Sequence, residues 1–187
     1  KFKINRASFT TNTAGTVNLV NDVVPVKTLR LNPITTIAGT TNEAINDSAT
    51  SVEMVSTKQF PTSGTILIGS EQITYTGKSS TSLTGLTRGA NSTSAASHSS
   101  GVAVGSTALR VHHRNHGMHG TSNNVTIAGV ASGTYNGVAS TNINGDYTSI
   151  SDIKMHSYVI TAQNSDFATA LGDVGGTTVT ATRNILY

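Results

Sequence analysis

The sequence predicts an all-β fold made of small antiparallel β-sandwich or meander modules, with long loops and little or no helix. Thr, Ser and Asn supply 31, 22 and 16 of the 187 residues. β-branched Thr favours strands, whereas Ser and Asn favour turns. Charged residues make up only 11% of the chain, against roughly 25% in ordinary globular domains. The apolar content of 36% is too high for a solvated tail, so the chain is expected to fold.

The N-terminal region, residues 1–39, is expected to consist of extended strands. Apolar and polar residues alternate in 1–9 and again in 16–20, with the polar turn TNTAG between them. Residues 23–31 continue the extended pattern, and two prolines place this stretch at a sheet edge or in a linker. Residues 35–50 show no pattern and are predicted to form a loop.

A compact strand series predicts a β-module over residues 40–105. The connections between its strands are two to five residues long, as in an antiparallel meander. A loop of small residues, 88–100, interrupts the series. The expected strands are 51–55, 65–69, 72–76, 83–87 and 102–104.

A second β-module is predicted over residues 106–164, followed by a C-terminal segment, 165–187. In that segment, Ser and Asp precede Ala-containing residues and Gly172 follows, which predicts a short helix over 165–171. The Thr/Val alternation of 175–183 predicts a final strand at an exposed edge. The expected strands of the second module are 108–113, 125–130, 147–150 and 155–161, with a turn and a short strand in 133–138.

Two segments, 62–85 and 121–145, resemble each other at an offset of about 60 residues. Tyr75 aligns with Tyr135, and the Gly, Ser and Thr that follow align as well. This similarity indicates either a duplicated module or a chance likeness between two turn-rich strand segments.

Charge and cysteine content narrow the function classes. The net charge of +3 is spread along the chain without a basic stripe, so no nucleic-acid partner is expected. No apolar run approaches the roughly 20 residues that span a bilayer, so no membrane partner is expected either. The absence of cysteine excludes disulfides, thiol catalysis and cysteine metal sites.

No residue set predicts catalysis. Glu71, Glu53 and Asp47 are the carboxylates of the first strand series, and Glu71 is placed in a turn between two strands. Acid–base catalysis needs a carboxylate pair in a cleft, and no pattern indicates one. No G-x-S-x-G motif supports any of the many possible Ser and His combinations. We therefore expect no enzymatic activity, no catalytic residues and no cofactor.

The segment VHHRNHGMHG concentrates four imidazoles, at His112, His113, His116 and His119. Such a cluster could bind a transition metal through nitrogen ligands. Its Gly and Asn content favours a bent loop, however, and no carboxylate lies nearby in the sequence to orient the rings. We expect a contact or turn element without a bound metal. Acid should charge several of these imidazoles together and loosen the surrounding contacts.

Three segments resemble structural proteins of tailed bacteriophages. Residues 60–104 read FPTSGTILIGSEQITYTGKSSTSLTGLTRGANSTSAASHSSGVAV and resemble a β-module that recurs in these virion proteins. The segments KFKINRASFTTNTAGTVNLVND (1–22) and VHHRNHGMHGTSNNVTIAGVASGTYNGV (111–138) resemble stretches of large virion proteins of marine contractile-tailed phages, cyanophages among them.

The resemblance implies a structural virion component of the tail, the baseplate or the fibre attachment. It implies assembly with further copies of the chain, as a trimer, and with other virion proteins. It also implies that 40–105 is an inserted module, because NPITT and GSTALRVHH stand close together in that family. Family members are much longer, and the missing initiator Met agrees with a piece of a longer protein. The expected location is the virion, assembled in the cytoplasm of a host bacterium.

A second hypothesis is an adhesin-type module that binds a host-surface glycan or another cell-surface polymer. Clusters of Asn, Ser and Thr can bind sugar hydroxyls, but such sites commonly add aromatic rings that stack on the sugar. Only four tyrosines are available in the two modules, Tyr75, Tyr135, Tyr147 and Tyr158.

Overall fold

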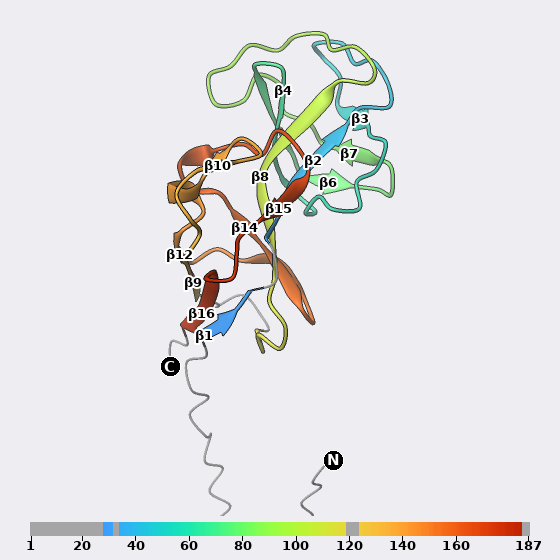
Figure 1. The fold of residues 1–187 in the computed structure, drawn as a ribbon. Helices are drawn as coiled ribbons and strands as arrows, with labels where there is room; N and C mark the ends of the chain where they lie inside the picture. Colours follow the sequence, from blue (N-terminus) through green and yellow to red (C-terminus); the bar gives the residue numbers. More distant parts are fainter. Residues whose placement is uncertain (1–27, 32–33, 119–123, 185–187) are drawn as a thin grey trace, which may run out of the picture.

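The chain folds almost entirely as β-structure, which confirms the predicted class. The computed structural model describes residues 28–31, 34–118 and 124–184, and within them it contains sixteen strands and two 3-10 helices. The strands form two lobes, which are stacked one above the other in Figure 1. Residues 41–102 build most of the upper lobe, named the inserted module because both of its ends join the sheet at one point. The remaining described residues build most of the lower lobe, named the base. The strands expected in 1–27 lie outside the described residues.

One side of the base is a four-stranded antiparallel sheet. Its strand order is β1-β16-β9-β12, and all three strand pairs are antiparallel. The strands are β1 (Thr28–Arg30), β16 (Thr180–Asn184), β9 (Asn124–Ala128) and β12 (Gly145–Tyr147).

A second sheet, of seven strands, runs from the base into the inserted module. Its main order is β13-β14-β8-β2-β15, and β4 adds β5 by pairing with β8. The base strands are β13 (Ser151–Lys154), β14 (Ser157–Thr161) and β15 (Gly172–Val174). The strands that continue upward are β2 (Ile34–Thr40), β8 (Ala103–His112), β4 (Gly64–Ile68) and β5 (Glu71–Tyr75).

Smaller elements complete the two lobes. The inserted module adds a three-stranded sheet of order β3-β7-β6, and the base adds the hairpin β10-β11. Their bounds are β3 (Ser51–Glu53), β6 (Gly77–Lys78), β7 (Ser82–Thr84), β10 (Thr134–Tyr135) and β11 (Val138–Ala139). The 3-10 helices are η1 (Ser140–Asn142) and η2 (Gln163–Ser165).

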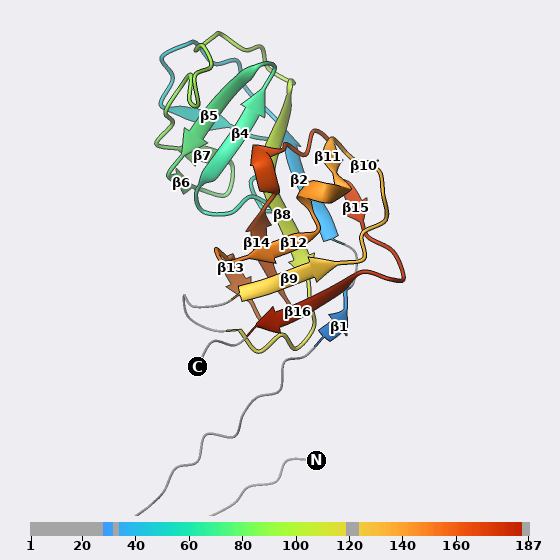
Figure 2. The ribbon, with the colours of Figure 1, turned by 90° about the vertical axis from the view of Figure 1, so that its left-hand side faces the viewer.

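Strand β8 belongs to both lobes. The first half of β8 pairs with β4 and its second half pairs with β14, while β2 runs along its other edge. Figure 2 shows β8 descending from the inserted module into the base. Thr40 and Ala103 are register partners, so residues 41–102 leave and return to the sheet at one point.

The two lobes have separate hydrophobic cores that meet on opposite faces of the shared strands. In β8, Leu109 and Val111 face the base core, whereas Val104 and Ala108 face the core of the inserted module. In β14, Tyr158 faces the base core and its neighbour Val159 faces the module core. Because successive side chains of a strand point to opposite faces, one sheet can support two cores.

Two sequence predictions fail at these shared strands. The loop predicted over 35–50 begins with most of strand β2, and the strands predicted at 102–104 and 108–113 are one strand, β8. Polar residues within both strands obscure their pattern. Thr36 in β2 is fully buried and donates its hydroxyl to the carbonyls of Ala170 and Gly172 at 2.8 and 3.0 Å, partners that are distant in sequence.

The C-terminal segment also differs from its prediction. No helix forms over 165–171, because Asn164 and Ser165 have left-handed φ angles of 55° and 52° and Ala168 forms an antiparallel bridge with Ser106. The last strand, β16, is not an edge strand, since it lies between β1 and β9.

The two similar segments do not form equivalent structures. In the first, β4 and β5 form a hairpin, whereas in the second β9 pairs with β12 and β16 rather than with β10. Tyr75 is buried, and Tyr135 is only partly buried. Among the described residues there is no helix of the length and apolar character needed to cross a membrane.

The antiparallel bridge between Ala168 and Ser106 of β8 makes the neighbouring Gly105 sensitive to substitution. A Cβ at Gly105 would lie 2.8 Å from the backbone oxygen of Ala168. We expect Gly105→Ala to lower the free energy of unfolding by about 1–3 kcal/mol, because backbone must move to accept the methyl group. Gly176→Ala is the control, since its Cβ would meet no atom within 4 Å, and it should change stability by less than about 0.5 kcal/mol. Urea denaturation of both variants measures the difference, and equal stabilities would contradict this packing.

Candidate functional site

The most concentrated polar network of the inserted module surrounds Glu71, the first residue of β5. The Glu71 side chain is only 1% exposed. The Arg88 guanidinium donates to both carboxylate oxygens, from Nε at 2.9 Å and from Nη2 at 2.8 Å. The backbone N–H groups of Gly89 and Ala96 donate at 2.9 and 3.2 Å. The imidazole of His98 lies with Nε2 2.7 Å from Oε2.

This network holds the Glu71 carboxylate in its ionised form. Burial by itself raises the pKa of Glu71, but the surrounding N–H donors outweigh burial and lower the pKa to about 2. His98 must donate Nε2–H, because an ionised carboxylate only accepts hydrogen bonds. With five donors around its two oxygens, Glu71 is suited to holding a loop in place. It is poorly suited to transferring protons.

Arg88 extends the network to two further segments. Its Nη2 donates to the carbonyl of Ala96 at 2.6 Å, and its Nη1 donates to the carbonyl of Asn46. The small-residue loop from 88 to 98 is thereby fixed against β5, and so is the segment around residue 46. The turn that the sequence predicts at Glu71 is wrong, because Glu71 is the first residue of β5. Its partners Arg88 and His98 are 17 and 27 residues away, so local sequence does not reveal them.

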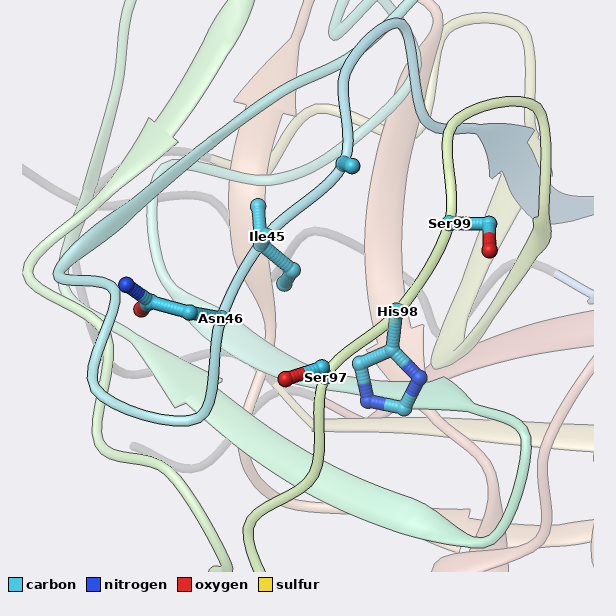
Figure 3. Close-up of a pocket in the computed structure, with 6 residues that line it drawn as sticks. Ile45, Asn46, Ser97, His98 and Ser99 are labelled. Atoms are coloured by element: carbon cyan, nitrogen blue, oxygen red, sulfur yellow. The ribbon is translucent and has the colours of Figure 1, made fainter.

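An open depression of about 480 Å³ lies on the surface beside this network. Figure 3 shows its two walls, Ile45 and Asn46 on one segment and 97–99 on the other. Ile45 and His98 join the walls as an antiparallel bridge, with backbone hydrogen bonds of 2.9 and 2.8 Å. The depression is therefore lined by amide, hydroxyl and imidazole groups, and the hydrogen bond from His98 to Glu71 holds one of its walls in place.

The predicted histidine cluster separates into two groups at the end of β8. His112 bonds through Nε2 to Thr35 Oγ1 at 3.1 Å. His113 and His116 are buried together against Tyr158, with ring centroids 5.4–5.8 Å apart. His119 lies outside the described residues. Within the part of the chain that is described, no three His, Cys, Asp or Glu side chains are grouped so that they could hold a metal ion.

The bonds of His116 fix its neutral form. Its Nδ1 accepts the N–H of Met118 at 3.0 Å, and its Nε2 lies 2.7 Å from the carbonyl of Lys154. Nε2 must therefore carry the proton, because a carbonyl only accepts. A proton on Nδ1 would break the hydrogen bond from the Met118 N–H, because a protonated Nδ1 cannot accept it. Burial lowers the pKa of His116. The hydrogen bond to the Lys154 carbonyl opposes this effect, and the neighbouring charges of Arg183 and His156 add to it.

His113 is also held neutral. Its Nδ1 lies 3.1 Å from the Tyr158 hydroxyl, while its Nε2 is buried without a hydrogen-bond partner among the described residues. Burial and then the proximity of His116 lower the pKa of His113 to about 4. The segment 113–118 is thus a packed turn against the β13–β14 hairpin, stabilised by uncharged imidazoles.

The tyrosines named for the glycan hypothesis mostly face the interior. Tyr75, Tyr147 and Tyr158 are buried, and the hydroxyls of the first two donate to backbone carbonyls. Tyr135 is partly buried, and its hydroxyl donates to the carbonyl of Ala131 at 3.0 Å. None of these four rings is fully exposed for stacking on a sugar.

No protein-family model matches the chain, and neither a curated protein nor a solved structure matches it. The functional conclusions therefore depend on the residues and their geometry.

Glu71→Gln tests whether the network stabilises the inserted module. The amide cannot balance the Arg88 charge, so we expect the free energy of unfolding to fall by about 3–5 kcal/mol. Glu53 is a partly exposed carboxylate of the same module, so Glu53→Gln is the control. Its free energy of unfolding should stay within about 0.5 kcal/mol of that of the unsubstituted chain. Chemical denaturation at pH 7 compares the two variants. If both lose the same small amount, the network does not stabilise the module.

The lowered pKa of His113 predicts that the fold loses stability in mild acid. Its pKa of about 4 in the fold is below the ordinary value of 6.5, so protons bind the unfolded chain first as the pH falls below 6.5. Stability is therefore present above pH 6.5 and decreases as the pH falls toward 4. At pH 4.5 the free energy of unfolding should be about 2–3 kcal/mol lower than at pH 7.5.

Substitution of His113 provides the control for this pH dependence. His113→Gln should flatten the decline between pH 7.5 and 4.5, whereas His156→Gln, at an exposed position, should leave it steep. Urea denaturation over this pH range measures both slopes. An unchanged slope in His113→Gln would contradict the assignment.

Proposed function

We propose that the chain is a structural virion component of a tailed bacteriophage, in the tail, the baseplate or the fibre attachment, and that it acts by subunit assembly. The proposal begins from the resemblance of residues 1–22, 60–104 and 111–138 to virion proteins of marine contractile-tailed phages. Its partners would be further copies of the chain, in a threefold arrangement, and other virion proteins. Its location would be the virion, after assembly in the host cytoplasm.

The observation that carries this proposal is the exposure of apolar side chains beside both edges of the shared sheet. β13 and β15 are the end strands of its main order, and Figure 2 shows them at opposite sides of the base. Met155, 81% exposed, directly follows β13, and Leu171, 56% exposed, directly precedes β15. Strand edges with adjacent apolar side chains are suited to contact with a neighbouring subunit.

The use of charge within the fold supports the same proposal. The ionisable groups Glu71, His113 and His116 are committed to bonds that hold loops in place, as described above. This pattern is typical of a scaffold, whereas a catalytic site needs a group in a cleft whose protonation can change during reaction.

A second candidate function is an adhesin-type module, and the depression beside His98 favours it. Asn46, Ser97 and Ser99 supply the groups that bind sugar hydroxyls. The inward orientation of most tyrosines makes this candidate weaker. Saturable binding on a glycan array that is lost in Asn46→Ala and Ser97→Ala would favour the adhesin; an array without signal would leave assembly as the better proposal.

Mass measurement in solution and analysis of particles test the assembly proposal. Sedimentation of the purified chain should give oligomers, and mass spectrometry of purified particles should detect its peptides. A stable monomer that no particle contains would contradict the proposal.

Met155 and Leu171 should contribute to the assembly contacts. Met155→Ser and Leu171→Ser should each weaken association by about tenfold, because burial of a side chain of this size contributes roughly 1.5–3 kcal/mol. Val55→Ser is the matched control, since Val55 is 66% exposed but lies in the inserted module after β3. Sedimentation equilibrium measures the association constants. Equal weakening by all three variants would indicate general surface hydrophobicity instead of an interface at the sheet edges.

A further inference from the structure

A cationic seam joins the inserted module to the base. Arg110 of β8, nine-tenths buried, crosses this seam. Its Nη2 donates to the carbonyl of Gln59 in the module at 3.2 Å and to Asp152 Oδ2 in the base at 2.5 Å. Asp152 has a left-handed φ of 44°, so the base holds this carboxylate on a less common backbone conformation.

Two lysines lie beside the same contact. Lys78 of β6 donates Nζ to the carbonyls of Thr57, at 3.1 Å, and Phe60. Lys154 Nζ lies 3.5 Å from Asp152 Oδ2 and is 55% exposed. Three of the eight Lys and Arg residues in 28–31, 34–118 and 124–184, namely Lys78, Arg110 and Lys154, therefore act on one another here.

This seam has too little negative charge for its cations. Asp152 is the carboxylate that bonds there, against the three positive side chains of Lys78, Arg110 and Lys154. Arg110 Nη1 is buried without an acceptor among the described residues. Burial lowers the pKa of Lys78, and the charges of Lys154 and Arg110 lower it further, with Asp152 opposing them. Unpaired donors and crowded like charges both cost free energy, and an added anion would reduce that cost.

We propose that the seam binds one oxyanion group, a carboxylate or a phosphate, between Lys78 of the inserted module and Lys154 of the base. Lys78 has three N–H donors, and two of them are used by backbone carbonyls. Lys154 is exposed and free to rotate toward the same group. The Arg110 guanidinium lies behind them and adds its charge. A bound oxyanion would join the two lobes directly, which goes beyond the assembly role and does not depend on it.

Calorimetric titration of the whole chain tests this site with two probes, inorganic phosphate and succinate, at constant ionic strength set by chloride. We expect saturable binding of one equivalent for at least one probe. Comparison of the two identifies phosphate or carboxylate as the chemistry that fits. Lys78→Met and Lys154→Met should each weaken binding by about tenfold, as expected for loss of one charge-assisted hydrogen bond. Arg30→Met, at an exposed position of β1 in the four-stranded sheet of the base, should leave binding unchanged.

A spectroscopic signal distinguishes this site from general attraction to a cationic protein. Bound anion should raise the pKa of Lys78, measured at its Cε by carbon NMR, and should leave that of Lys58 nearly unchanged. Lys78→Met also removes bonds within the module, so the exposed Lys154→Met keeps the test valid if that variant fails to fold. Absence of saturable binding, or binding that Lys154→Met retains in full, would overturn the proposal.

Discussion

The structure depends on the pairing of one strand, β8, with three others. Its ladder with β2 spans both lobes, while β4 and β14 divide its opposite edge between them. Side chains on one face of these strands complete the base core, and those on the other face complete the module core. Neither core is closed without β8, and the position of the inserted module follows from this shared ladder.

Polar groups stabilise the loops and the contact between lobes that surround the shared strands. Glu71 fixes the loop from 88 to 98, His116 fixes the turn after β8, and Arg110 crosses between the lobes. The chain contains few charged residues, and the buried ones, Glu71 and Arg110, each bond to segments that are distant in the sequence. This arrangement agrees with the proposed assembly role, in which the loops would keep their shape while other subunits contact the sheet edges.

The sequence predicts local strands better than shared ones. The hairpin of β4 and β5 follows from alternation over a few residues, since its partners are neighbours in the chain. β2 is missed, and β8 is predicted as two separate strands, because Thr36 and Ser106 are polar yet buried and their bonds go to residues 168–172. Local periodicity cannot reveal such partners.

The same reason limits prediction of the candidate sites. The sequence identifies the histidine segment but not the division between His112 on one side and His113 with His116 on the other. It identifies neither the Glu71 network nor the Arg110 seam. Arg88 and His98 are 17 and 27 residues from Glu71, and Asp152 and Gln59 are 42 and 51 residues from Arg110. A useful signal is the rarity of charge: in a chain this poor in charged residues, a carboxylate next to an apolar strand is a candidate for a buried ion pair.

Native-state hydrogen exchange in urea tests most directly the claim that β8 unites the two lobes. The amides of Ile73 in β5 and Ile127 in β9 report on the module and on the base. If the shared strand couples the cores, both amides should exchange with the same free energy of opening and the same dependence on urea. A lower free energy and a smaller urea dependence for Ile73 would show that the inserted module opens alone, and would contradict the account.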